Sequence, residues 1–458
     1  MMRLQIPKFS RARAITTTAV VGSLVAGGIW LSRMHTGAFE FPGATPVHFF
    51  GAKVPQELTK DLLAKALEEA GTATELPKEV SLKIDGQPQK VIVQYAFDAN
   101  LQDAMEKQFK SYHPDYGAFV AIEATTGRVL SMVSFMGAKP LAGEVPVNLA
   151  LQATFPSAST FKVVTASAAI AERNFSGETV ISFSGRNHTL YKSNIMKDGG
   201  RWQRRMTLKE AFARSVNTVF GKIGAFTLGA EQMRDYASRF GFNRAIAADV
   251  PMQAGKAFIS NDPWELAEAA SGYTRDNTMS PLQGALIASA IVNDGTMMEP
   301  YAIQSLHRQD GTEIYTSKPK ISAVAVDHVT AGQVRALMKE TVVSGTSRKS
   351  FRGFFKREYA NINVGGKTGS LTGDSPQGKY DWFVGYADAG GGRKIAVAAL
   401  TVNRQVWRVK SSFLARLAFE SYFKQPKVAR SLARTVAGSA HAGQPTPAAF
   451  TGPYVLRR

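Results

Sequence analysis

Apolar residues recur at helical or alternating spacing along the chain, and these patterns predict its elements. Near the N-terminus, residues 55–70 have apolar side chains at helical spacing, with Pro55 suited to the first turn and Gly71 to the stop. The stretch "SLKIDGQPQKVIVQYAF", residues 81–97, alternates in the manner of two strands that turn at its Asp-Gly pair. These two segments, with the Gly/Pro/Phe-rich residues before them, predict a linker and small module over residues 32–90.

The pattern changes from about residue 91. Strand-like runs occur early and late, and a mostly helical stretch fills residues 156–295 between them. The predicted strands lie in residues 117–135, 359–369, 381–388 and 394–403, and the predicted flanking helices are 101–112 and 407–423. This order predicts an α+β domain over residues 91–425, with an antiparallel sheet, flanking helices and an all-helical subdomain.

One predicted helix has clear signals at both ends. In "SPLQGALIASAIVNDG", Ser280 is the expected N-cap, Pro281 the first helical residue and Gly295 the residue past the end. After residue 425 the composition shifts to Ala, Gly, Pro and Arg, which predicts a disordered tail over residues 426–458.

The N-terminus has the pattern of a membrane anchor. Residues 1–13 are basic, and residues 14–31 carry no charge and include Trp30. Eighteen helical residues span about 27 Å, close to the thickness of a bilayer core, and basic residues hold the preceding end in the cytoplasm. A cleaved signal peptide and a buried core helix are the alternatives. We expect a single-pass transmembrane helix with the remainder outside the cytoplasm.

Composition and charge narrow the classes of protein. The chain has 458 residues, no Cys and a formal charge of +19. Thiol catalysis, disulfides and Cys-based zinc sites are therefore excluded. Nucleic-acid-binding motifs are not found, so the positive charge better suits a membrane surface or an anionic cell-wall polymer. The seven His residues show no ligand spacing, and we expect no metal.

Three short motifs carry candidate chemistry. In "STFK", Ser159 and Lys162 are one helical turn apart, so a partly desolvated Lys could take the Ser proton. The structural alternative is an N-cap Ser beside a surface Lys. In "SVN", Ser215 and Asn217 could point into one cleft, or could simply lie at a helix boundary.

The third motif is "GGKTGS". Flanking glycines let another backbone approach a strand closely, and Lys367 and Thr368 could then bind a carboxylate. The alternative is a glycine turn between strands. Each motif alone is weak, but the order S-x-x-K, S-x-N, K-T-G in an extracytoplasmic protein is a strong joint signal.

With these three motifs, the sequence resembles the penicillin-recognising active-serine family. The resemblance extends over about residues 91–425 and is closest to the transpeptidase domains of penicillin-binding proteins, as in "GAFVAIEATTGRVLSMVS" and "TMSPLQGALIASAIVNDG". It implies a transpeptidase or β-lactamase-like fold. It also implies a peptidoglycan D,D-transpeptidase in the bacterial inner membrane, with a periplasmic catalytic domain acylated by β-lactams.

Other members of the family remain alternatives. A D,D-carboxypeptidase uses the same residues with water as the acceptor. A class D β-lactamase shares "STFK" and "WFVG" but usually has S-x-V, where this chain has Asn217, and a Tyr-Gly-Asn motif that is not found. A non-catalytic cell-wall scaffold would lack a catalytic residue, and none is missing.

The resemblance also implies roles for individual residues. Lys162 would deprotonate Ser159, and Ser215 would pass the proton to the leaving D-Ala. The substrate would be a stem peptide, bound through Asn217 and, at its carboxylate, through Lys367 and Thr368. Gly369 and Ser370 complete the strand motif, and the backbone N–H groups of Ser159 and Ser370 would form the oxyanion hole. No cofactor is implied, and a separate glycan polymerase is a possible partner.

Overall fold

The computed structural model describes residues 58–71, 74–138, 146–197, 203–374 and 376–424, which belong to one compact unit. The predicted anchor at residues 14–31, the basic segment before it and the tail at 426–458 lie outside these residues. Among the described helices, none is both long and apolar enough to cross a bilayer.

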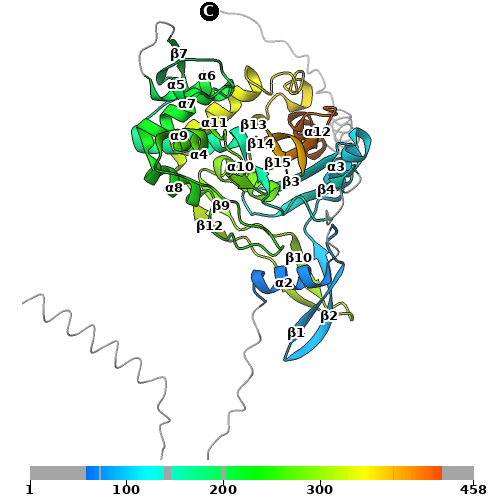
Figure 1. Cartoon of the computed structure of the whole chain (residues 1–458). Helices are drawn as coiled ribbons and strands as arrows, with labels where there is room; N and C mark the ends of the chain where they lie inside the picture. The colour runs from blue at the N-terminus through cyan, green and yellow to red at the C-terminus, as the bar shows by residue number, and fades with distance from the viewer. Residues whose placement is uncertain (1–57, 72–73, 139–145, 198–202, 375, 425–458) are drawn as a thin grey trace, which may run out of the picture. The chain divides into compact units, whose positions relative to one another are not determined.

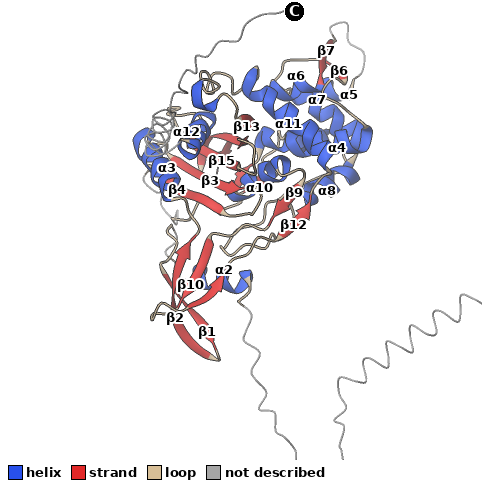
Figure 2. Cartoon of the chain, turned by 180° about the vertical axis from the view of Figure 1, so that it is seen from behind, coloured by secondary structure: helices blue, strands red, loops and turns tan. Residues whose placement is uncertain are grey.

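The centre of the domain is a five-stranded antiparallel sheet, coloured red in Figure 2. Its strand order is β13-β14-β15-β3-β4, so strands from both ends of the domain lie side by side and β13 forms an edge. The α+β prediction is confirmed. The strands are β3 (Tyr116–Glu123), β4 (Val129–Met136), β13 (Asn363–Asp374), β14 (Gln377–Asp388) and β15 (Lys394–Asn403).

Helices cover both faces of this sheet, as Figure 1 shows. Alternate residues of β3 enter different cores, because Val120 packs on the side of α10 (Pro281–Val292) while Phe119 packs with α3 (Ala99–Tyr112) and α12 (Ser411–Phe423). This explains why the central strands read as nearly continuous apolar runs.

The ends of α10 follow the sequence prediction. The Ser280 side chain accepts a hydrogen bond from the Gln283 N–H, and Pro281 is the first helical residue. Gly295 has φ +92° and donates to the carbonyl of Ala290, which closes the C-terminal end. All residues of this helix are buried.

A mostly helical subdomain occupies the chain between β4 and β13, with two short two-stranded sheets. Its helices are α4 (Lys162–Arg173), α5 (Lys192–Met196), α6 (Leu208–Ala213), α7 (Asn217–Lys222), α8 (Ala230–Arg239), α9 (Pro263–Ser271) and α11 (His328–Val343), with a 3-10 turn η1 (Ala158–Phe161), a π turn η2 (Ile223–Leu228) and, just before β13, a 3-10 turn η3 (Arg357–Tyr359). The short strand pairs are β5 (Phe155–Pro156) with β8 (Thr278–Met279) and β6 (Val180–Phe183) with β7 (Arg204–Thr207).

The N-terminal module contains the predicted hairpin, β1 (Glu79–Ile84) and β2 (Gln87–Tyr95), which turns at Asp85 and Gly86 with positive φ at both. The predicted boundary at residue 90 falls inside β2. Two later strands complete this sheet, in the order β1-β2-β10-β11. These are β10 (Ile303–His307) and β11 (Glu313–Thr316), and β9 (Thr296–Met298) pairs separately with β12 (Ile321–Val324).

Two predicted helix starts were wrong by four or five residues. Helix α2 (Lys60–Ala70) begins after Thr59, whose side chain accepts from the Leu62 N–H, and not at Pro55. Helix α12 begins at Ser411 and not at residue 407. In both cases a hydrogen-bond acceptor fixes the first turn, and apolar spacing carries no information about it.

Candidate active site

Ser159 lies in a tight turn between β5 and α4. The turn is η1, and Ala158 within it has φ +49°, a left-handed conformation that is uncommon for a residue with a side chain. Two contacts from other elements hold the turn: the Trp382 indole N–H donates to the Pro156 carbonyl at 2.9 Å, and the Ser157 N–H donates to the Asn277 carbonyl at 2.7 Å. The turn is therefore fixed to the sheet before any ligand binds.

Lys162, the first residue of α4, lies directly beneath Ser159. Its side chain is fully buried, and Nζ is 2.8 Å from Ser159 Oγ, 2.8 Å from Asn217 Oδ1 and 2.5 Å from the Ser271 carbonyl oxygen. A neutral amine has two N–H donors and one lone pair. The amide and carbonyl oxygens match the two donors, which leaves the lone pair for the Ser159 hydroxyl.

The second motif approaches the same amine from the helical subdomain. Ser215 has φ +56° in the connection between α6 and α7, and Asn217 is the first residue of α7. The Asn217 side chain accepts from Lys162 and donates to the His188 carbonyl at 3.0 Å, which fixes its amide orientation. The spacing of the motif thus places two polar side chains in one cleft.

The third motif lies on the edge strand β13. Lys367 is fully buried, and its Nζ donates to Ser215 Oγ at 2.8 Å and to the Thr368 carbonyl at 2.9 Å. A Cβ added to Gly369 would lie 3.2 Å from the Ser157 carbonyl oxygen, so this glycine permits the close approach of strand and turn that the sequence predicted.

The two buried lysines determine the electrostatics of the site. Burial lowers the pKa of Lys367 to about 7. Burial, and then the positive charge of Lys367, lowers the pKa of Lys162 well below its ordinary value. Both effects favour the neutral amine, the form that can accept a proton.

These groups open into one cleft of about 370 Å³. Six of the eight predicted residues line it, and the other two, Lys162 and Lys367, lie beneath it and are hydrogen-bonded to lining residues. The six are Ser159, Ser215, Asn217, Thr368, Gly369 and Ser370. The structure therefore brings together every residue singled out from the three motifs.

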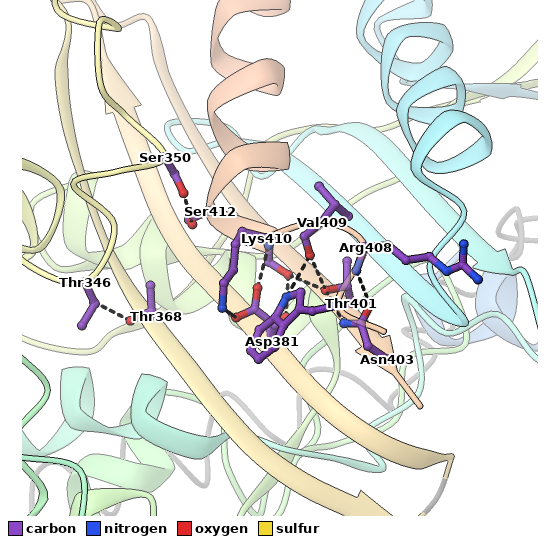
Figure 3. Close-up of polar contacts among 12 residues, drawn as sticks. Thr346, Ser350, Thr368, Asp381, Thr401, Asn403, Arg408, Val409, Lys410 and Ser412 are labelled. Carbon is purple, nitrogen blue, oxygen red and sulfur yellow. Dashed lines mark hydrogen bonds and ion pairs between the residues drawn. The ribbon is translucent and has the colours of Figure 1, made fainter. Parts of the chain in front are cut away.

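Several groups that line or support the cleft were not predicted from the sequence. The Ser271 carbonyl has no side-chain signature, and the His188 ring lines the cleft with a pKa lowered by burial and by the charge of Lys162. The hydroxyls of Thr346 and Thr368 are 2.6 Å apart, and a dashed line marks their contact in Figure 3. The segment "VVSGTS", residues 342–347, contains Thr346 and also resembles the transpeptidase domains of penicillin-binding proteins, and it was the one available signal for this residue.

A polar cluster supports the far side of the cleft (Figure 3). The Asp381 carboxylate accepts from the Ser411 N–H at 2.7 Å and pairs with Lys410 at 3.6 Å, so it caps the start of α12 from a neighbouring strand. The hydroxyls of Ser350 and Ser412 are 2.7 Å apart. No group of three or more His, Asp or Glu side chains suited to a metal occurs among the described residues.

The arrangement places a serine hydroxyl against a buried amine, beside an edge strand that carries a second buried lysine. The family model for the penicillin binding protein transpeptidase domain matches residues 117–420, and the chain belongs to this family.

Relatives and solved structures agree with this assignment. The peptidoglycan D,D-transpeptidases PbpA of Mycolicibacterium smegmatis and Mycobacterium tuberculosis are each 29% identical, over 63% and 66% of this chain and 62% and 64% of their own lengths. The chain thus spans less than two thirds of these relatives. The fold resembles an imipenem acyl-enzyme of penicillin-binding protein A from M. tuberculosis, with a TM-score of 0.60, 24% identity and coverage of 74% and 80%. It also resembles a D,D-transpeptidase domain from Eggerthella lenta, with a TM-score of 0.58, 23% identity and coverage of 75% and 95%.

Proposed function

We propose that this protein is a peptidoglycan D,D-transpeptidase that cross-links stem peptides through an acyl-enzyme on Ser159. The observation that carries the proposal is the hydrogen bond between Ser159 Oγ and a fully buried amine whose other contacts are both acceptors. The names of its relatives support the choice of reaction, and its family membership supports acylation by β-lactams.

In the first half of the reaction, Lys162 takes the proton of Ser159 as its Oγ attacks the penultimate D-Ala carbonyl of the donor stem peptide. The oxyanion is held by the backbone N–H groups of Ser159 and Ser370, and an oxyanion-hole donor contributes about 3 to 4 kcal/mol to lowering the barrier. Ser215, hydrogen-bonded to Lys367, delivers the proton to the leaving D-Ala.

Substrate orientation comes from the edge strand and from Asn217. The terminal carboxylate of the donor binds protonated Lys367 and the Thr368 hydroxyl, which Thr346 orients through their 2.6 Å contact. The extended peptide lies along the free edge of β13, and the Asn217 amide binds its backbone. An amine from a second stem peptide then takes the acyl group, and a separate glycan polymerase would supply the strands.

The location follows from the reaction. Peptidoglycan is assembled outside the cytoplasmic membrane, so we place the catalytic domain on the extracytoplasmic side. The uncharged segment at residues 14–31 would be its anchor.

Intact mass after adding benzylpenicillin to the full chain tests the proposal. We expect a lasting adduct on Ser159 that is absent from the Ser159→Ala variant. The substitution should change the free energy of unfolding by no more than about 1 kcal/mol, because Ser159 is a partly exposed turn residue. An adduct that disappears while the drug is consumed would instead indicate a β-lactamase. Folded protein without any adduct would refute an acylating function.

The acceptor is tested separately, with a D-Ala-D-Ala-ended stem peptide and a free amine. A cross-linked product supports transpeptidation. Release of D-Ala with water as the only acceptor would assign a carboxypeptidase.

A further inference from the structure

A basic segment lies between α11 and β13, beside the cleft, and residues 344–356 are called the basic loop below. Ser347, Phe351 and Phe354 face inward and are fully buried. Phe351 packs against the rings of Phe383 and Phe419, with centroids 5.6 and 6.3 Å away. These buried aromatic side chains attach the loop to the sheet and to α12.

Further contacts fix the backbone of the basic loop. The Arg416 guanidinium of α12 donates to the carbonyls of Ser350 at 3.2 Å and Arg352 at 2.9 Å. The hydroxyl of Ser350 also contacts Ser412, as Figure 3 shows. The loop therefore presents its outward side chains from a defined backbone.

The outward side chains of this loop are mostly cationic. Arg348, Lys349, Arg352 and Lys356 are exposed, and none forms an ion pair with a carboxylate in the described part of the chain. Four unpaired cations within nine residues repel one another, which an anionic ligand would relieve.

Three of these cations line a groove of about 670 Å³ formed by the basic loop and the end of α11, called the basic groove below. Arg348, Lys349 and Arg352 supply its charge, and Val343 and Phe355, which are 48% and 38% exposed, supply apolar surface. Lys349 also lines the catalytic cleft, so the groove and the cleft adjoin along this side chain.

We propose that the basic groove binds the acceptor stem peptide through its carboxylate. This inference rests on the proposed transpeptidase function. Once the terminal D-Ala has left, the acyl group of the donor still occupies the cleft at Ser159, so the second peptide must enter from a surface that adjoins the cleft. It ends in a carboxylate of its own, which guanidinium groups bind well. The mixed lining suits a peptide with methyl side chains better than a uniform polyanion.

Binding there would favour the second half of the reaction. The acceptor amine nitrogen forms a bond to the acyl carbon, and the bond from that carbon to Ser159 Oγ breaks. The amine proton returns through Lys162 to Ser159 Oγ. Holding the acceptor beside the cleft raises the local concentration of the amine, which competes with water for the acyl group. The groove therefore sets the ratio of acyl transfer to the amine over hydrolysis by water.

The double variant Arg348→Gln/Arg352→Gln of the full chain tests this proposal, because neither residue lines the catalytic cleft. Lys83→Gln/Lys90→Gln removes the same charge from exposed positions of β1 and β2 and is the matched control. The probes are two acceptor stem peptides that differ only in a C-terminal carboxylate or a C-terminal amide. The readouts are kcat/KM for each acceptor and the rate of acylation by benzylpenicillin.

For the protein without substitutions we expect a preference for the carboxylate acceptor. The double variant should lose about fivefold in kcat/KM for that acceptor, as two exposed ion pairs contribute. Its kcat/KM for the amide and its acylation rate should be unchanged, and the control should behave like the parent protein.

Equal use of both acceptors by the parent protein, or an unchanged preference in the double variant, would overturn the proposal. Binding of the full chain to anionic lipid vesicles is measured alongside, and a double variant that lost only this binding would also overturn the proposal. Absence of both acylation and transfer in the parent protein would refute the transpeptidase function itself, so the two failures are distinguishable.

Discussion

Replacing Lys367 by Met should make the fold more stable and, on the proposed function, abolish acylation by benzylpenicillin. Burial lowers the pKa of Lys367 from 10.5 to about 7, and a difference of this size corresponds to about 5 kcal/mol against the folded state at low pH. Methionine has a similar length and carries no charge. It loses two hydrogen bonds, to Ser215 Oγ and the Thr368 carbonyl, worth about 1 kcal/mol each. The net expected gain is about 3 kcal/mol below pH 7.

The difference in stability between the parent protein and Lys367→Met depends on pH, and its direction follows from the pKa of Lys367. The pKa of Lys367 is lower in the folded than in the unfolded chain, so between pH 7 and 10.5 the unfolded chain binds more protons. The stability of the parent protein relative to Lys367→Met therefore rises with pH in this window, by about 1.4 kcal/mol per pH unit. The advantage of the variant should be full below pH 7 and disappear near pH 9, at about the point where the charge and hydrogen-bond contributions balance.

Equilibrium unfolding in urea, followed by Trp fluorescence at several pH values between 6 and 10, measures this difference. Lys339→Met, at an exposed position of α11, is the control and should change stability by less than about 0.5 kcal/mol at every pH. A Lys367→Met variant that is less stable at pH 7, or whose advantage does not change with pH, would refute the reasoning.

Three other predictions concern catalysis. Lys162→Arg keeps a cation that cannot release its proton, so acylation by benzylpenicillin should fall at least about 100-fold in mass spectrometry. Gly272→Ala should slow acylation about tenfold or more, because its Cβ would lie 1.9 Å from the Ala158 carbonyl oxygen and shift the nucleophile turn. Gly311→Ala, also at positive φ but with open space, should leave acylation unchanged. The rate of acylation by benzylpenicillin should first rise and then fall with increasing pH. The fall near pH 7 reports the deprotonation of Lys367, and it should be absent with benzylpenicillin methyl ester.

Much of the fold could be predicted because its signals are local. The Ser280 cap, the Asp-Gly turn of the hairpin and the apolar runs of β14 and β15 each depend on neighbouring residues. The pairing of β2 with β10 could not be predicted, because about 200 residues separate Gln94 from its partner Ser305. Alternation of apolar and polar residues indicates a strand but does not show which other strand it pairs with.

The same distinction holds within the site. Ser159 and Lys162 are one turn apart, so their contact follows from helical spacing. The acceptor for the second N–H of Lys162 is the carbonyl at the end of α9, and a carbonyl has no sequence signature. Likewise the start of α12 is fixed by Asp381 on another strand, which is why the sequence placed that helix too early.

The two buried lysines are electrostatically linked, because the charge of Lys367 disfavours the protonated form of Lys162. Lys162 belongs to the helical subdomain and Lys367 to the sheet, and the charge of Lys367 adds to the effect of burial in lowering the pKa of Lys162. A substrate carboxylate beside Lys367 favours its protonated form, and that charge in turn keeps Lys162 neutral. In the proposed mechanism, binding the donor therefore prepares Lys162 to take the Ser159 proton. Below pH 7 Lys367 is protonated in any case, but an ester cannot form the ion pair with it that holds the acid in place. The methyl ester of benzylpenicillin should therefore acylate Ser159 more slowly than the acid at every pH below 7.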